Sequence, residues 1–376
     1  MSVKQYRLPA VFMRGGTSKG LMLHRGDLPA DQAAWAPLFL AAMGSPDPYG
    51  RQLDGMGGGL SSLSKVCVIG PSSRPDADVD YTFAQVQIKT SHVDFRPNCG
   101  NMSSAVGPFA VDEDLIRVYG DEAVVRIHNT NTGKIIVARF GMEDGLAAVE
   151  GDLAIPGVAG TGAPLHLDFL DPAGATTGRL LPTGSVADVL EVAGFGPVRA
   201  SMVDASNACV FVLAADLGLQ GDETPAAIEA DTRLMARLQA IRVAASVRMG
   251  VAADETSAAA STAVPFVGFV APPAGGSDAD FQARVLSNGQ PHRALPLGVS
   301  VCLATAARLE GSVVHGVCRA APGVDLRIAM PSGVLPVTAA VQRDADGAWR
   351  VERGGFYRTQ RRLFEGTLLL RHPLPA

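Results

Sequence analysis

The chain has 376 residues, of which 47% are hydrophobic and 18% charged, so it can build more than one buried core. A net charge of −5, 6% aromatic residues and no basic run argue against a nucleic-acid partner. The five cysteines and seven histidines are scattered singly, which excludes a disulfide framework or a zinc motif. The N-terminus has no signal-peptide core and no apolar run is long enough to span a membrane, so we expect a cytoplasmic protein without a membrane partner.

The predicted elements follow from hydrophobic periodicity and turn residues. Gly and Pro are frequent, with 42 and 25 residues and no collagen-like period, which indicates many turns between short strands. Apolar alternation predicts strands, Asn and Gly clusters predict hairpin turns, and Thr-Pro followed later by Arg and Gly marks the ends of a helix. In chain order we expect strands at 79–88 and 91–95, a helix of small residues at 98–111, a hairpin at 124–140, a long helix at 222–249 and a second small-residue helix at 298–307.

The second half of the chain repeats features of the first. Each small-residue helix precedes a hairpin with matching letters, Arg126-Ile127 before Gly133 and Arg327-Ile328 before Gly333, about 200 positions apart. Helices of short side chains can be enclosed by tightly curled sheets. The repeat predicts an α+β protein of two similar lobes, each a curled, mostly antiparallel sheet around a central helix, with a cleft between them. Chance similarity between two Ala-rich segments is the alternative.

We expect the lobes to divide within the Pro- and Gly-rich stretch 156–184, close to Thr183. The N-terminal lobe is then residues 1–183 and the C-terminal lobe 184–376, whose last segment could return to the first lobe.

Three Gly-rich segments, 14–20, 54–59 and 98–101, lie in the first hundred residues. Glycine lets a backbone turn its N–H groups toward an anion. A single such segment is more often just a turn, but three of them beside reactive side chains indicate a site. Cys99 stands at the expected start of the helix 98–111, where the helix dipole favours a thiolate and free N–H groups hold a carboxylate. A small buried cysteine is the other interpretation of Cys99. The remaining cysteines are interpreted as core.

Lys65 leads into an apolar strand and is the second candidate for chemistry. Partial desolvation there favours the neutral amine, which can act as a base. A surface lysine that closes a loop is the alternative. The second lobe offers polar groups near its own helix and hairpin, Ser287, His292, Arg293 and Ser332. The arginines at 358, 361 and 362 could bind a carboxylate but are also typical of a solvated face.

Several ordered motifs resemble a known family. They are Met13-Arg14-Gly15-Gly16-Thr17-Ser18-Lys19-Gly20, Gln52-Leu53-Asp54-Gly55-Met56-Gly57-Gly58, Ser64-Lys65-Val66, Asp80-Tyr81 with Phe83-Ala84-Gln85-Val86, and Asn98-Cys99-Gly100-Asn101. Later segments around 204–212, 292–296, 331–333 and 358–366 extend the match over nearly the whole chain. The sequence resembles the PrpF-like family, which includes 2-methylaconitate cis–trans isomerase, 4-oxalomesaconate tautomerase and methylitaconate isomerase.

The resemblance implies the diaminopimelate-epimerase fold, the catalytic pair Lys65 and Cys99, and no metal or organic cofactor. The candidate substrate contacts come from the Gly-rich segments, the two helix starts and the second-lobe polar groups: Arg14, Gly16, Thr17, Ser18, Gly57, Gly58, Asn98, Gly100, Asn101, Ser287, His292, Gly298, Val299 and Ser332. Two departures bear on substrate choice. Met330 stands where His is expected before Pro, and Phe266 stands where Lys commonly follows Pro.

The expected activity is a 1,3-allylic proton shift, or a cis–trans isomerisation, in a small unsaturated di- or tricarboxylic acid. The sequence leaves open which of the two catalytic residues is the base, which acid is the substrate, and whether the protein is a homodimer. A two-thiol racemase or epimerase is an alternative, but it needs a cysteine where Gly298 and Val299 begin the second helix. A non-catalytic binder of organic acids is another.

Overall fold

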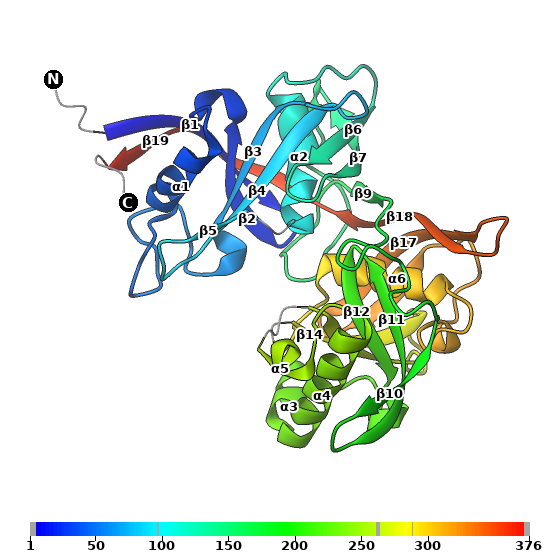
Figure 1. The fold of residues 1–376 in the computed structure, drawn as a ribbon. Coiled ribbons are helices and arrows are strands. Elements are labelled where there is room, and N and C mark those ends of the chain that lie inside the picture. The colour runs from blue at the N-terminus through cyan, green and yellow to red at the C-terminus, as the bar shows by residue number, and fades with distance from the viewer. Residues whose placement is uncertain (1–4, 96–97, 261–263, 288, 372–376) are drawn as a thin grey trace. The chain divides into compact units, whose positions relative to one another are not determined.

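The computed structural model describes residues 5–95, 98–260, 264–287 and 289–371, and its fold is shown in Figure 1. The chain forms two compact units. The first contains Met1–Asp168 and Tyr357–Ala376, and the second contains Phe169–Phe356. No helix in the described part of the chain is long and apolar enough to cross a membrane.

The predicted boundary at Thr183 falls inside the second unit, because the chain from Asp171 to Thr177 is bonded to that unit. The N–H of Asp171 donates to the carbonyl of Glu352 at 2.9 Å. The buried Asp204 carboxylate accepts from the N–H groups of Thr176 and Thr177 at 2.8 and 2.6 Å. The terminal segment from Tyr357 clusters with the first unit, and its last strand pairs with the first strand of the chain.

The first unit is built mainly from strands. They are β1 (Gln5–Gly15), β2 (Ser18–His24), β3 (Lys65–Pro71), β4 (Val79–Val86), β5 (Val93–Asp94), β6 (Glu122–Asn129), β7 (Lys134–Glu143), β8 (Leu146–Ala147), the start of β9 (Leu165–Leu170) and β19 (Gln360–Arg371). β1 pairs antiparallel with both β19 and β2, which the blue and red strands of Figure 1 show. β2 runs parallel to β3, β3 is antiparallel to β4, and β4 runs parallel to β6.

Helix α2 (Gly100–Asp112) is the central helix of this unit, and helix α1 (Trp35–Met43) lies outside the sheet. Residues Met102–Val111 of α2 are all buried. Short side chains are required there: a Cβ added to Gly107 would lie 2.8 Å from the ring of Phe140. On α1 the aromatic residues Trp35 and Phe39 pack against a different face of the strands, together with Val66 and Val68.

The second unit contains its own central helix, α6 (Leu297–Arg308), and a second layer of helices. Its strands are β10 (Asp188–Val192), β11 (Gly196–Ala205), β12 (Asn207–Leu213), β13 (Phe266–Ala271), β14 (Phe281–Ser287), β15 (Gln290–Pro291), β16 (Leu326–Met330), β17 (Gly333–Arg343) and β18 (Trp349–Arg358), and its other helices are α3 (Pro225–Ala230), α4 (Thr232–Arg248) and α5 (Glu255–Ala259). α6 lies in one hydrophobic cluster with Phe211 and Phe281, whereas α4 lies in another with Phe269.

The predicted single helix at 222–249 is wrong. The structure has two helices, because the Asp231 backbone is extended and its carboxylate accepts from the N–H of Leu234 at 2.9 Å. Asp231 thereby ends α3 and caps the start of α4.

The predicted repeat is visible in the register of the two units. In the first, Arg126 pairs with Val137 and Ile127 with Ile136; in the second, Arg327 pairs with Pro336 and Ile328 with Leu335. The same clamp precedes both hairpins. Asp78 donates its N–H to the carbonyl of Arg126 and accepts from the N–H of Arg126, at 2.7 and 2.6 Å. Asp280 makes both bonds with Arg327, each at 2.7 Å.

Candidate active site

Lys65 is the first residue of β3 and its side chain is only 8% exposed. It lies between Gly20 of β2 and Gln85 of β4 in the sheet. Gly20 allows this close pairing, since a Cβ there would lie 2.7 Å from the carbonyl oxygen of Lys65. The ammonium Nζ lies 2.7 Å from Gln85 Oε1 and 4.9 Å from the centroid of the Phe83 ring. Lys65 is therefore a largely buried amine held by a neutral acceptor.

Cys99 is the N-cap residue of α2 and is half-buried. Its backbone is extended and its thiol makes no capping bond. Its carbonyl oxygen accepts from both the N–H and the hydroxyl of Ser103, at 2.9 and 3.0 Å. These two bonds fix the turn that carries the thiol. The first N–H groups of a helix have no acceptor within the helix, so this end of α2 favours negative charge.

Cys67 connects the two candidates electrostatically. It is fully buried on β3 and donates to the hydroxyl of Tyr81 at 3.8 Å. The pKa of Cys67 lies above its usual value because burial and the neighbouring thiol of Cys99 raise it, whereas the bond to Tyr81 and the Lys65 ammonium oppose the rise. Burial likewise raises the pKa of Tyr81, whose hydroxyl also bonds Ser103. Lys65 and Cys99 thus both act on the same buried thiol.

The hairpin turn between β1 and β2 lies against the start of α2. Gly16 has a φ of +51°, and a Cβ there would lie 2.2 Å from Asn101 Oδ1. The same Asn101 oxygen accepts from the N–H of the exposed Thr17 at 3.3 Å, while Ser18 is buried as β2 begins. Arg14 donates to the carbonyls of Gly16 and Thr359, each at 3.0 Å. Burial, followed by the nearby Arg361, lowers the pKa of Arg14.

A buried glutamine organises the Gly-rich loop that precedes Lys65. Gln52 has a φ of +54° and its Oε1 accepts from the N–H of Gly59 and the hydroxyl of Ser64, at 2.9 and 2.6 Å. Gly57 has no room for a side chain, since its Cβ would lie 2.3 Å from that oxygen, and a Cβ on Gly58 would lie 2.7 Å from Leu63. The loop is therefore packed tightly up to the residue before Lys65.

The predicted hairpin at 124–140 is β6 and β7, and its turn holds both β4 and the segment before α2. Asn131 accepts from the N–H of Phe83 and donates to its carbonyl, each at 2.8 Å. Asn129 donates to Asn98 Oδ1 at 3.3 Å. These contacts position Phe83 and Asn98, the neighbours of Lys65 and Cys99.

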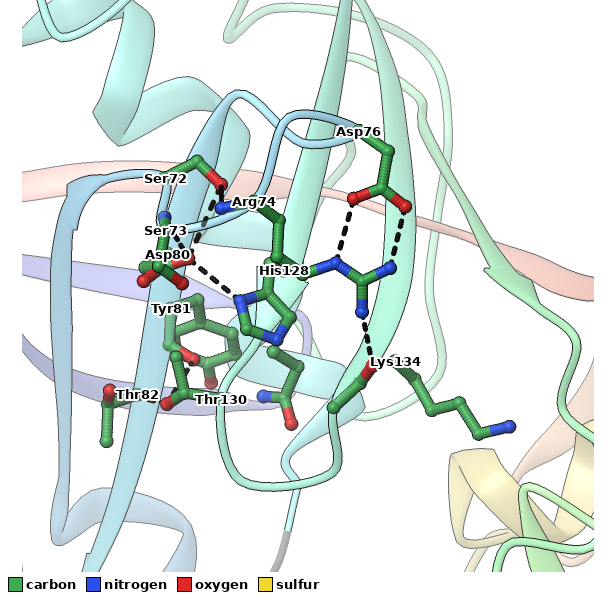
Figure 2. Close-up of polar contacts among 12 residues, drawn as sticks. Ser72, Ser73, Arg74, Asp76, Asp80, Tyr81, Thr82, His128, Thr130 and Lys134 are labelled. Atoms are coloured by element: carbon green, nitrogen blue, oxygen red, sulfur yellow. Dashed lines mark hydrogen bonds and ion pairs between the residues drawn. The ribbon is translucent and has the colours of Figure 1, made fainter.

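Figure 2 shows the polar contacts of β4 and β6 beyond this turn. His128 Nδ1 lies 2.8 Å from the carboxylate of Asp80, which also accepts from the N–H of Ser73 at 3.1 Å. Burial raises the pKa of Asp80, but these two partners outweigh it and hold the value below its usual range. The hydroxyl oxygens of Thr82 and Thr130 lie 2.6 Å apart and form a hydrogen bond. The cluster joins the parallel strands that carry Tyr81 and the Asn-rich turn.

Five of the predicted substrate contacts belong to the second unit. Ser287 ends β14, and Ser332 is exposed in the turn between β16 and β17. His292 Nδ1 accepts from the N–H of Ala294 at 3.1 Å, and burial lowers the pKa of this histidine. Gly298 and the buried Val299 lie in the first turn of α6, where a Cβ on Gly298 would lie 1.9 Å from Asn207 Nδ2.

The repeat places neither a lysine nor a cysteine at the matching positions of the second unit. Phe266 begins β13 and pairs with the parallel strand β12, as Lys65 begins β3 and pairs with β2. Pro296 is the N-cap of α6, where the first unit has Cys99. Cys302 lies inside α6 and is fully buried. Met330, found where His was expected, is a buried residue at the end of β16.

Sequence reasoning assigned no role to Gln85, which contacts Lys65, to Tyr81, which contacts Cys67, or to Asn131, which contacts Phe83. A signal for Gln85 was present: Tyr81, Phe83 and Gln85 alternate along one strand, so they share a face. The register between β3 and β4, which places this face beside Lys65, cannot be predicted from the sequence of either strand alone. In the described part of the chain, no group of three or more His, Cys, Asp or Glu could hold a metal ion.

Comparisons with known proteins identify the family. The family model described as PrpF protein matches residues 5–371. The 3-methylitaconate isomerase of Eubacterium barkeri is 44% identical over 96% of this chain and 97% of its own length. The 2-methyl-aconitate isomerase of Cupriavidus necator is 37% identical and the 4-oxalomesaconate tautomerase of Pseudomonas putida 38%, each over 97% of both chains.

Solved structures agree with this assignment. A crystal structure of methylitaconate-delta-isomerase has a TM-score of 0.90 and 43% identity, covering 98% of this chain and 96% of that one. A hydroxyproline epimerase from Agrobacterium vitis, 14% identical with a TM-score of 0.56, covers 98% of this chain and 94% of its own and shares the fold alone. The fold is the α+β diaminopimelate-epimerase fold. The chain therefore belongs to the PrpF protein family, and like its named relatives it is an isomerase.

Proposed function

We propose that this isomerase moves a proton within a small unsaturated di- or tricarboxylic acid, with Lys65 and Cys99 as its acid–base pair. The observation that carries the proposal is the placement of a largely buried amine, Lys65, at the start of β3 and a half-buried thiol, Cys99, at the start of α2, which packs against β3. The named relatives support the substrate class, because methylitaconate, methylaconitate and oxalomesaconate are all unsaturated polycarboxylates.

The chemistry is a 1,3-allylic shift. A carboxylate conjugated to a C=C bond makes the γ C–H acidic, because the electron pair left behind is delocalised as a dienolate. One of the two residues removes that proton, and the other delivers a proton to the far carbon of the allyl system, so the double bond moves and no net charge is gained. While the dienolate exists its former double bond can rotate, which gives cis–trans isomerisation by the same route.

The start of α2 is the proposed carboxylate site in the first unit. Gly100 and Asn101 begin this helix, and the glycine turn at 16–17 lies directly against Asn101. Helix N-termini stabilise anions, and one well-placed donor to a developing oxyanion contributes about 3 kcal/mol. In the second unit, Ser287, His292, Gly298, Val299 and Ser332 remain predictions for substrate contacts.

The racemase alternative lacks its second thiol, because Pro296 caps α6. We propose that the reaction needs no metal or organic cofactor. We further propose a cytoplasmic location and a homodimer, with neither nucleic acid nor membrane as a partner; five free cysteines suit a reducing compartment.

Proton NMR in D₂O, without added metal, tests the proposal with 3-methylitaconate, 2-methylaconitate and 4-oxalomesaconate as separate substrates. We expect deuterium at an allylic carbon of one acid. Lys65→Ala and Cys99→Ser should each lower the exchange rate about 100-fold or more, since a positioned acid or base typically contributes that much. Near-native exchange in either folded variant would contradict the pairing. Ligand-induced thermal stabilisation without exchange of any acid would indicate a binding protein instead.

A further inference from the structure

The side chain that holds Lys65 has its own orientation fixed by other groups. Gln85 Nε2 donates to the carbonyl oxygens of Ser61 and Ser64, each at 3.0 Å. An amide nitrogen has only donors and an amide oxygen only acceptors, so these two carbonyls force Oε1 toward Lys65. The contact of 2.7 Å between Oε1 and Nζ is therefore imposed by the loop before β3.

The elements packed around Lys65 bring several titratable groups. Cys67 lies on the same strand, Tyr81 on β4 and Cys99 at the start of α2. On β5, Asp94 is the direct cross-strand partner of Gln85. On β2, Lys19 stands beside Gly20, and its ammonium lies 5.8 Å from the ring of Phe12. Among the described residues no carboxylate lies within 4.0 Å of Lys65 Nζ, and the hydrogen-bond partner of Nζ is the uncharged amide of Gln85.

A neutral acceptor has a specific consequence for an acid–base lysine. A carboxylate at 2.7 Å would stabilise the ammonium far more than the amine and would keep the proton on nitrogen. An amide oxygen accepts a hydrogen from either form, so it fixes the position of Nζ at little cost to proton transfer. Phe83 adds no charge beside Nζ, and its ring, whose centroid lies 4.9 Å away, attracts an ammonium far more weakly than a carboxylate would.

We propose that Gln85 is a positioning residue for Lys65, which holds Nζ in place with a neutral acceptor and thereby keeps this amine able to exchange a proton. The inference rests on the proposed function of Lys65, but the contact itself can be measured without any substrate. Gln85 acts through its contact with Lys65, and this role requires no contact with the substrate.

The chain offers a direct measurement, because it contains only five lysines. With ¹³Cε-labelled lysine, the pH titration of each side chain is followed by NMR, and Lys65→Arg assigns the Lys65 signal. We expect Gln85→Glu to move the titration midpoint of Lys65 upward by about one pH unit or more. Gln87→Glu is the matched control, since it adds the same charge on an exposed side chain two residues along the chain. An unmoved Lys65 midpoint in folded Gln85→Glu would overturn the inference.

Kinetics supply the second test on the acid identified by deuterium exchange. The pH profile of kcat/KM should move in the same direction and by the same amount as the NMR midpoint in Gln85→Glu, but not in Gln87→Glu. Gln85→Met keeps the size of the side chain and removes the acceptor, so kcat should fall about tenfold or more while KM changes little. Native kcat in folded Gln85→Met would also overturn the inference.

The experiments distinguish failure of the proposed reaction from failure of the positioning role of Gln85. If no acid exchanges deuterium but the Lys65 midpoint moves as expected, the proposed reaction fails and the contact stands. If exchange depends on Lys65 while neither Gln85 variant has an effect, the reaction stands and the positioning role fails.

Discussion

Exposure separates the five cysteines more sharply than their sequence contexts do. Cys67, Cys209 and Cys302 are fully buried, whereas Cys99 and Cys318 are half-buried. Burial raises the pKa of both Cys67 and Cys318, which lowers the fraction of reactive thiolate at each of them. Cys99 alone combines partial exposure with the start of a long buried helix.

We therefore expect iodoacetamide at pH 8 to modify Cys99 first. Mass spectrometry of peptides from a time course should show labelling of Cys99 at least about tenfold faster than of Cys67, because a buried thiol is both inaccessible and protonated. Cys99→Ser should remove the fast phase. Labelling of Cys67 at a rate equal to that of Cys99 would contradict the burial described here.

At this scale the sequence indicated two candidate catalytic residues, but it did not indicate the side chains that surround them. Lys65 and Cys99 stood out because each is a reactive group beside glycine or at the edge of an apolar run. Gln85 did not, because its role depends on which residue the neighbouring strand brings opposite it. Asn131 was visible only as a turn residue, although its side chain bonds both backbone groups of Phe83.

Among the elements, the β1–β2 turn packs closely against the start of α2. Gly16 is required twice over, by its φ of +51° and by the 2.2 Å that a Cβ would leave to Asn101 Oδ1. The turn can shift away only by breaking the 3.0 Å bond between the Gly16 N–H and the Thr359 carbonyl.

Gly16→Ala should lower the free energy of unfolding by about 1–3 kcal/mol, the usual cost of a strained backbone position. Urea titration measures the change. Gly26→Ala is the control, because a Cβ at Gly26 meets nothing within 4 Å. The double variant Gly16→Ala with Asn101→Ala relieves the clash but not the strain, so it should recover part of the loss. Equal stability of the two single variants would refute the argument.

The elements also show where periodicity fails. Residues 222–249 have helical character throughout, yet Asp231 divides them, because an aspartate can end one helix and cap the next. In a helical sequence pattern, an aspartate is usually interpreted as a residue on the solvated face of the helix. The hairpin at 124–140 was easier to predict, because the Asn and Gly residues of its turn are rarely found inside a helix or strand.

At the scale of the whole molecule, the repeat was predictable because its hairpins keep the same letters. The boundary between the units was not predictable. It depends on hydrogen bonds from the segment 174–177 to Asp204, and composition does not indicate a contact between residues so far apart in sequence. The clamps of Asp78 and Asp280 were missed as well, although Asp-Ala-Asp stands before both β4 and β14.

The two clamps should contribute equally and independently. Asp78→Ala and Asp280→Ala each remove one side-chain hydrogen bond to an arginine N–H, so each should lower the free energy of unfolding by about 1 kcal/mol. They lie in different units and share no partner, so the double variant should lose the sum to within about 0.5 kcal/mol. Chemical denaturation of the three variants measures this, and a deviation above 1 kcal/mol would show that the clamps are coupled.

The pairing of β1 with β19 dictates an order of assembly on the ribosome. Every strand of the second unit follows β1 in the chain and precedes β19, so β1 is synthesised well before its partner β19. The unit that carries Lys65 and Cys99 is therefore the last to close, with one edge of β1 unpaired until then. Unpaired strand edges invite association with other chains, so β1 is the segment of this protein that a chaperone would have most reason to shield during synthesis.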